Sequence, residues 1–250
     1  SKLKKKLFQK NMQCKITKYL ENSSCKSNNN ESTNYTYFQL SKTDVYQKSV
    51  NKLYNEPDDG CWYKENLHKI PCNIIAKKLL DTGAFMQHVI LECFQKYIDD
   101  YLKLDIHIHE IIKSNGRFDA KITGTKDSIS KLCLEYQFTH NLPTINLEVK
   151  SIKIKDKSKK TGAIVDVQRI KPDFFEVMIL GTYFKNTLNV YIGKPNTSWT
   201  FLSNGLSDDR GYRINFCNNI SLHNNTETSL KNIDYQITKL MSKIFVIQLT

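Results

Sequence analysis

The chain has 250 residues and a formal net charge of +12, from 37 Lys and Arg against 25 Asp and Glu. This length suits one large α/β domain or two small ones, and the charge favours polyanionic partners such as nucleic acid or an anionic membrane. No apolar run approaches the roughly 20 residues of a membrane helix, and the opening SKLKKKLFQK lacks the apolar segment of a signal peptide. We therefore expect a soluble, intracellular protein with no membrane-embedded part.

The cysteines exclude a secreted disulfide scaffold. There are seven of them, an odd number without a repeated short spacing. Cys61 and Cys72, with His68 between them, have the chemistry of zinc ligands, but the chain contains no CxxC pair. A structural zinc site is therefore not expected.

The chain divides into two parts by composition. Residues 1–75 form a basic and polar N-terminal region, partly helical at its start and rich in Asn and Ser near 21–34. Residues 76–250 carry regular hydrophobic periodicity and are expected to form the main domain.

A long helix and several strands are predicted in order along the main domain. Residues 81–104 place apolar side chains at helical spacing. Strand alternation follows at 104–111, and further strands are predicted at 117–124, 131–138 and 143–154, the last two joined by a hairpin at 139–143.

The remaining residues complete an α/β pattern. A short helix is predicted at 161–170, strands at 172–184 and 186–193, and a C-terminal helix at 228–243. This order indicates an α/β sandwich with a central mixed β-sheet flanked by helices.

The strand at 143–154 has one apolar and one polar face. Glu148 and Lys150 share the polar face, and Asp119, on an earlier strand of the same sheet, can lie beside them. Two carboxylates would bind Mg²⁺ through oxygen and leave water positions for attack on a phosphodiester. The lysine would orient or deprotonate that water and neutralise developing charge.

An Asp on one strand and Glu-X-Lys on the next, after an amphipathic helix and before an apolar strand, resembles the PD-(D/E)XK nuclease superfamily, which includes many type II restriction endonucleases. The resemblance covers residues 81–193. It implies a restriction-endonuclease-like three-layer sandwich and a magnesium cofactor that Mn²⁺ can replace. It also implies metal ligation by Asp119 and Glu148, catalysis by Lys150, and a supporting role for Gln87, where the family often has a helical Glu. The products would carry a 5′-phosphate and a 3′-hydroxyl.

The chain departs from the family pattern in two places. Phe118, and not Pro, precedes Asp119. The long separation between Asp119 and Glu148 also leaves an alternative pair open, in which Glu135 and Gln137 replace Glu148 and Lys150. We prefer Glu148 and Lys150 because a lysine-rich loop, a helix and an apolar strand are predicted after them, as in the family.

Other polar residues have a binding interpretation beside a plainer one. Lys153 and Lys155 can hold DNA phosphates, and Arg210 and Arg213 can read bases, although charged loops are often only solvated. His107 and His109 share a strand face and have the chemistry of metal ligands; the water-exposed face of an edge strand is the preferred interpretation.

The leading hypothesis is a Mg²⁺-dependent, sequence-specific endonuclease that hydrolyses double-stranded DNA. Restriction enzymes of this kind are often homodimers, which match a palindromic site. One alternative is a non-catalytic nucleic-acid-binding protein on a nuclease-like fold, which would bind in a salt-sensitive way without cleavage. Another is an RNA-directed endonuclease similar to the cap-snatching domain of a viral polymerase, which would prefer single-stranded RNA.

Overall fold

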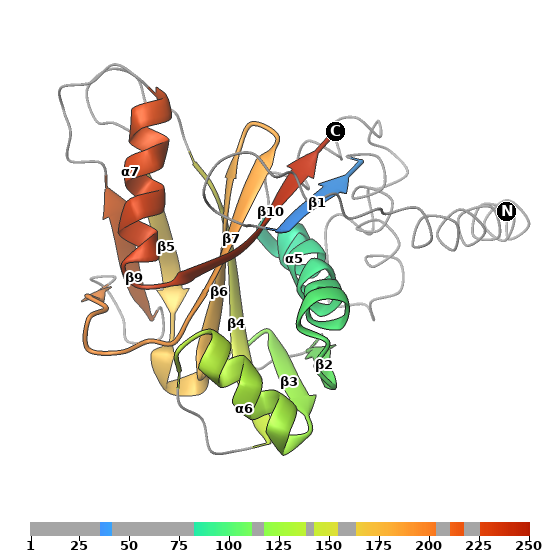
Figure 1. Cartoon of the computed structure of the whole chain (residues 1–250). Helices are drawn as coiled ribbons and strands as arrows, with labels where there is room; N and C mark the ends of the chain where they lie inside the picture. Colours follow the sequence, from blue (N-terminus) through green and yellow to red (C-terminus); the bar gives the residue numbers. More distant parts are fainter. Residues whose placement is uncertain are drawn as a thin grey trace, which may run out of the picture.

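The computed structural model describes residues 36–41, 83–111, 118–138, 143–154, 164–203, 211–217 and 226–250. Their strands form two sheets (Figure 1). The larger, mixed sheet contains, in spatial order, β1 (Thr36–Leu40), β10 (Ser242–Leu249), β7 (Thr187–Gly193), β6 (Val177–Phe184), β4 (Thr144–Lys153), β3 (Ala120–Gly124) and β2 (Ile106–Glu110). The smaller sheet contains β5 (Ile164–Ile170), β9 (Tyr212–Cys217) and β8 (Leu202–Ser203).

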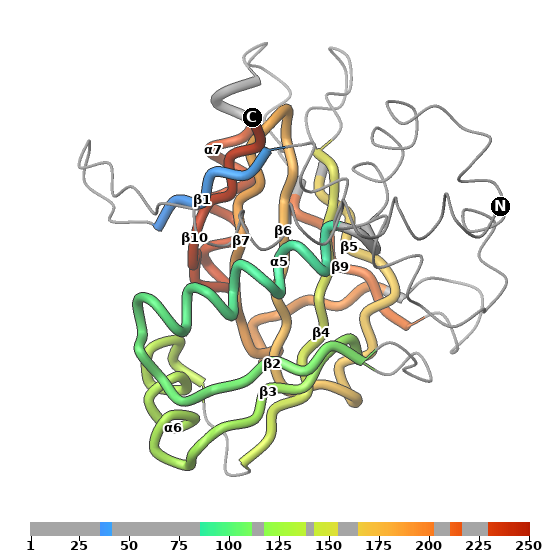
Figure 2. Tube along the Cα trace, turned by 90° about the vertical axis from the view of Figure 1, so that its right-hand side faces the viewer, coloured from blue at the N-terminus to red at the C-terminus, as the bar shows by residue number. Residues whose placement is uncertain are grey.

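Three layers result, because each face of the large sheet has its own cover. Helix α5 (Gly83–Tyr97), extended by a π-helical turn at Ile98–Leu102, crosses one face (Figure 2). Helix α6 (Lys126–Glu135) adds buried side chains to the same core. The other face packs against the small sheet and α7 (Thr226–Thr238). A short 3₁₀ helix at Pro172–Phe174 joins β5 to β6.

The central strand β6 shows why both faces must be covered. Val177, Ile179 and Tyr183 point into the core under α5, whereas Met178 and Leu180 point into the core under the small sheet. A Cβ on Gly181 would lie only 2.6 Å from Ile90 Cδ1. The missing side chain therefore lets α5 approach the sheet closely.

The pairing around β4 fixes the arrangement near the predicted site. β2 pairs antiparallel with β3, β3 pairs antiparallel with β4, and β4 pairs parallel with β6. β4 is twice as long as β3 and extends past the start of its neighbour. Among the described residues, β4 pairs with β3 only from Thr144 to Leu147.

Several sequence predictions are confirmed. The long helix appears as α5 and its π-helical turn, and the strands predicted at 104–111, 117–124, 143–154, 172–184 and 186–193 appear as β2, β3, β4, β6 and β7. The α/β class with a mixed sheet is confirmed as well. Its second face is covered mainly by a sheet, where helices alone had been expected.

Two element predictions are wrong, and a third, the C-terminal helix, is confirmed as α7 but ends earlier than predicted. Residues 131–138, predicted as a strand, belong to α6 and the turn after it, because Thr125 caps the helix by accepting from Ser128 N at 3.3 Å, and Ile129, Leu132 and Cys133 are buried at helical spacing. The predicted hairpin therefore has no first strand; residues 139–142 lie outside the described part.

The other two concern the small sheet and the C-terminus. Residues 164–170, predicted as helix, form β5, with Val165 and Val167 buried on its inner face. The C-terminal helix ends at Thr238, and residues predicted to extend it begin β10 instead. β10 is an inner strand of the large sheet, second from one edge, and β1 from the N-terminal region pairs with it in parallel.

Among the residues that the structure describes, no helix combines the length and apolar character needed to cross a membrane.

Candidate active site

The middle of β4 turns one set of side chains into the core and another toward the small sheet. Leu147 and Val149 are fully buried under α5. Glu148 and Lys150 point to the opposite face, where their side chains are 8% and 20% exposed. A buried carboxylate on an otherwise well-packed strand is costly unless it has a partner, and here Lys150 Nζ forms an ion pair with Glu148 Oε1.

Asp119 lies directly before β3, at the point where β4 loses its neighbour. Its backbone N–H donates to Leu147 O at 3.0 Å. Its Oδ2 accepts from Val149 N at 2.8 Å, so the carboxylate takes the place of the next backbone hydrogen bond between the two strands. Since Ala120 pairs with Leu147, Asp119 lies across from Glu148 on the same face.

Gln87 reaches the backbone of the same residue, Val149, from α5. Its Nε2 donates to Val149 O at 2.5 Å. Together, Asp119 and Gln87 occupy both backbone groups of the residue that separates Glu148 from Lys150. The structure thus brings together all four residues that the sequence reasoning selected for the site, while Glu92 interacts with His88 instead.

The environment of Glu148 disfavours its ionised form, mainly because the carboxyl group is buried. Burial raises the pKa of Glu148 to about 7. The positive charge of Lys150 opposes this rise, the negative charge of Asp119 adds to it, and Lys171 opposes it more weakly. Ionised Glu148 therefore lowers the stability of the folded state. An additional cation beside the two carboxylates would reduce this loss of stability.

Lys171 is a site neighbour that sequence reasoning missed. It follows β5 and begins the 3₁₀ turn, and its positive charge acts on Glu148. A Cβ on Gly211 would come within 3.0 Å of Lys171 Cγ, so the glycine, at φ +65°, leaves room for the lysine stem. No local motif marks Lys171; the return of β5 toward the start of β6 brings it there.

The oxygen donors of the site suit a hard cation. Within the described ranges, no group of three or more His, Cys, Asp or Glu side chains could hold a metal ion. Asp119 and Glu148 supply two carboxylates on one face, a donor set that fits Mg²⁺, which is commonly bound by one or two carboxylates with water and substrate phosphate. It does not fit structural zinc, which needs four nitrogen or sulfur ligands.

The remaining predicted residues lie elsewhere. Lys153 is exposed at the end of β4, and Arg213 lies on β9 in the small sheet. His107 and His109 are exposed on β2, and His109 Nε2 lies 2.9 Å from Thr123 Oγ1. Lys155 and Arg210, like the zinc candidates Cys61, His68 and Cys72, lie outside the described residues.

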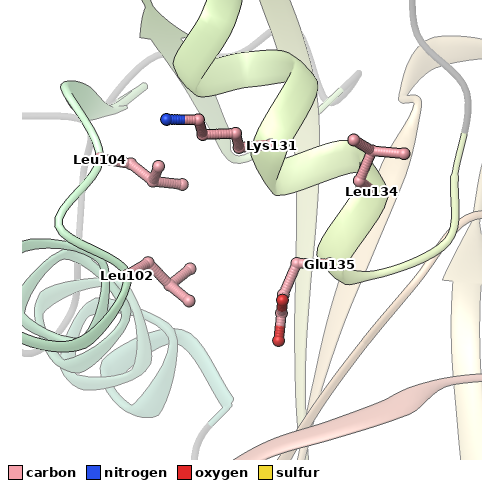
Figure 3. A pocket seen from close by; sticks show the side chains of 5 residues that line it. All are labelled: Leu102, Leu104, Lys131, Leu134 and Glu135. Carbon is pink, nitrogen blue, oxygen red and sulfur yellow. The ribbon is translucent and has the colours of Figure 1, made fainter.

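The alternative pair loses the strand on which it depends. Glu135 is the last residue of α6, and Gln137 follows in a turn with φ 56°. Glu135 also lines an open cavity of about 450 Å³ between α6 and the π-helical turn, with Leu102, Leu104, Lys131 and Leu134 (Figure 3). None of the four clustered site residues lines this cavity.

The side chains of Asp119, Glu148, Lys150 and Gln87 determine what chemistry the cluster can support. Two carboxylates can hold a cation, Lys150 can stabilise negative charge, and Gln87 can fix the backbone between them. Comparisons with protein-family models, with curated proteins and with solved structures found no significant match. Its chemistry is therefore inferred from its own geometry.

Proposed function

We propose that this protein is a metal-dependent phosphodiesterase, and specifically a Mg²⁺-dependent endonuclease that acts on DNA. The observation that carries the proposal is the hydrogen bond from Val149 N to Asp119 Oδ2, which seats one carboxylate beside the Glu148 and Lys150 pair. Perturbed pKa values cluster at functional sites, so an acid–acid–lysine group in which one acid is desolvated supports a catalytic role.

The order of elements supports the resemblance to the PD-(D/E)XK superfamily. Helix α5 precedes β2, β3 and β4, and a crossover leads to β6, parallel to β4. Asp119 stands at the start of one strand and the Glu-X-Lys segment on the next. Two departures are clear: α6 lies between β3 and β4, and the described part of the crossover contains β5 and a short 3₁₀ helix, where an α-helix was expected. A restriction-endonuclease-like fold is part of the proposal on these grounds.

Each residue then has a distinct task. Asp119 and Glu148 would hold Mg²⁺ or, as a substitute, Mn²⁺. The ion, when bound, polarises the phosphate and makes the attacking water more acidic. Lys150, as the ammonium group that pairs with Glu148, would orient that water, and its charge would stabilise the negative charge that develops on the phosphate. Gln87 holds the Val149 carbonyl, which keeps Glu148 and Lys150 at fixed positions.

The reaction is an in-line displacement. The water oxygen forms a bond to phosphorus while the bond from phosphorus to the 3′-oxygen breaks. The attacking water gives up a proton to solvent, and the leaving 3′-oxygen takes up a proton from solvent. The products carry a 5′-phosphate and a 3′-hydroxyl, as the resemblance implies.

The substrate part of the proposal is double-stranded DNA cut at specific sequences by a homodimer. The net charge of +12 supports a polyanionic substrate. Lys171, close to Glu148 and outside the metal-ligand pair, adds a positive charge where a scissile phosphate would lie. Cleavage of single-stranded RNA, or binding without cleavage, are the competing outcomes.

The test is cleavage of plasmid DNA and of single-stranded RNA with Mg²⁺, Mn²⁺ or EDTA. Wild type should yield discrete DNA fragments with either metal and none with EDTA. Glu148→Gln and Lys150→Met should each lower the rate by at least roughly 100-fold. Glu135→Gln, the same chemical change at the end of α6, is the matched control and should cut normally.

Three outcomes would contradict parts of this proposal. RNA degradation without DNA cleavage would assign the site to an RNA-directed endonuclease. Salt-sensitive binding without cleavage under any metal would leave a nucleic-acid-binding protein on a nuclease-like fold. Equal loss of activity in Glu135→Gln and Glu148→Gln would remove the carboxylate cluster from the reaction.

A further inference from the structure

His88 lies on α5 directly after Gln87 and contacts two carboxylates at once. Its Nδ1 is 2.9 Å from Glu110 Oε2, and its Nε2 is 3.2 Å from Glu92 Oε1. Burial alone would lower the pKa of His88, but the hydrogen bonds and charges of Glu110 and Glu92 outweigh it and raise the pKa to about 9. The imidazolium form, which donates from both nitrogens, suits this arrangement.

The two carboxylates connect His88 to different parts of the molecule. Glu92 is one helical turn along α5 and 39% exposed, so its bond stays within the helix. Glu110 is the last residue of β2 and pairs with Ala120 in β3. Of the two bonds that His88 makes, the one to Glu110 joins α5 to the sheet.

The chain continues from Glu110 directly to the candidate site. Ile111, the next residue, donates from its backbone N–H to Asp119 O at 2.9 Å. The backbone that carries Glu110 thus holds Asp119 in place, and Asp119 holds Val149 N. From the other side, Gln87 holds Val149 O, and Gln87 is the chain neighbour of His88.

A closed circuit of contacts results. It runs from His88 through Glu110 and Ile111 to Asp119, across the backbone N–H and C=O of Val149 to Gln87, and back along α5 to His88. A change in the distance between α5 and the end of β2 would therefore move the backbone of Val149, the residue between Glu148 and Lys150. Small displacements of catalytic groups have large effects on rate.

We propose that His88 is a positioning residue. Through Glu110 it sets the separation of Gln87 and Asp119, which bind the backbone C=O and N–H of Val149. The catalytic consequence rests on the proposed nuclease function, whereas the geometric consequence does not. His88 touches no reacting atom; it acts through the two residues that hold Val149.

A second contact between α5 and β2 serves as a control. It distinguishes a specific effect of His88 on Val149 from a general effect of holding α5 against the sheet. Gln95 Nε2 donates to Ile106 O at 2.8 Å, and Gln95 Oε1 accepts from Ile108 N at 2.7 Å. Gln95 lies two turns beyond His88, at the other end of β2. It joins the same two elements but is not part of the circuit around Val149.

The experiment compares four variants, His88→Leu, Glu110→Gln, Glu92→Gln and Gln95→Ala, after thermal unfolding has shown that each is folded. Amide hydrogen exchange of Val149, followed by NMR, reports the circuit without any need for activity. His88→Leu and Glu110→Gln should speed this exchange about tenfold, whereas Glu92→Gln and Gln95→Ala should leave it near the wild-type rate.

Steady-state cleavage kinetics add the catalytic readout. His88→Leu and Glu110→Gln should lower kcat roughly tenfold with little change in KM, because positioning acts on the chemical step. Equal effects of Gln95→Ala and Glu110→Gln on Val149 exchange would overturn the proposal in favour of simple helix docking, and so would no effect of Glu110→Gln. If wild type does not cleave, the nuclease proposal fails, and the exchange data still decide the role of His88.

Discussion

Two partly or wholly buried charged clusters lie on opposite faces of the large sheet. The carboxylate cluster, Asp119, Glu148 and Lys150, lies on the face toward the small sheet. The histidine cluster, His88, Glu92 and Glu110, lies on the face under α5. A titratable group has a raised pKa in each, about 7 for Glu148 and about 9 for His88.

The same direction of shift has opposite meanings in the two clusters. For Glu148, burial dominates and the raised pKa means that the charged form is disfavoured. For His88, two carboxylates outweigh burial, and the raised pKa means that the charged form is favoured. The histidine cluster therefore stabilises the fold at neutral pH. The carboxylate cluster costs stability there, as is common where a protein prepares a site for a cation or a substrate.

The largest effect on stability is expected from Glu148→Gln. The folded state keeps the Glu148 proton up to about pH 7 while the unfolded state loses it near 4.5, so wild-type stability falls between these values. The shift corresponds to about 3 kcal/mol. The free energy of unfolding of the variant, relative to that of wild type, should therefore rise by this amount between pH 4.5 and pH 8. Urea denaturation at each pH measures this difference. A difference that stays constant with pH would show that Glu148 is not held at a cost.

A smaller effect with a different pH window is expected from His88→Gln. The stabilisation by the raised pKa is fully present below pH 6.5 and is lost as pH rises toward 9. Because the ring is 22% exposed and partly screened, about 2 kcal/mol is expected. Wild type should lose this advantage over His88→Gln between pH 6.5 and 9, in the same denaturation series. An advantage already lost by pH 7 would mean that the glutamates do not hold the imidazolium.

Local periodicity was enough to predict the elements that bring the carboxylate cluster together. The alternation along β4 separates Glu148 and Lys150 from Leu147 and Val149, and the helical stripe of α5 includes Gln87. These patterns depend only on neighbours in the chain. Residues 131–138 show where prediction from local periodicity fails. A short apolar run fits a strand or a helix, and here the N-cap at Thr125 favours the helix.

Contacts between distant segments could not be predicted in this way. The spacing of His88 and Glu92 suggests a pair within α5, but the bond from His88 to Glu110 depends on how α5 lies over β2. Lys171 comes near Glu148 only because β5 forms a second sheet where a helix was expected. Strand pairing across long separations depends on tertiary packing, which single-sequence patterns do not contain.

The smallest predicted effect is the most direct test of the difference between the clusters. Mg²⁺ bound by Asp119 and Glu148 should raise the free energy of unfolding at pH 8 by about 1.4 kcal/mol at about ten times its Kd, because only the folded state holds both carboxylates together. Asp119→Asn should abolish the gain, and Glu110→Gln should keep most of it, since the histidine cluster already has its cation in His88. Titration of unfolding midpoints with MgCl₂, with NaCl of equal ionic strength as the control, separates specific binding from screening. A gain that survives in Asp119→Asn would place the ion elsewhere, and the cost of burying Glu148 would then be unconnected with metal.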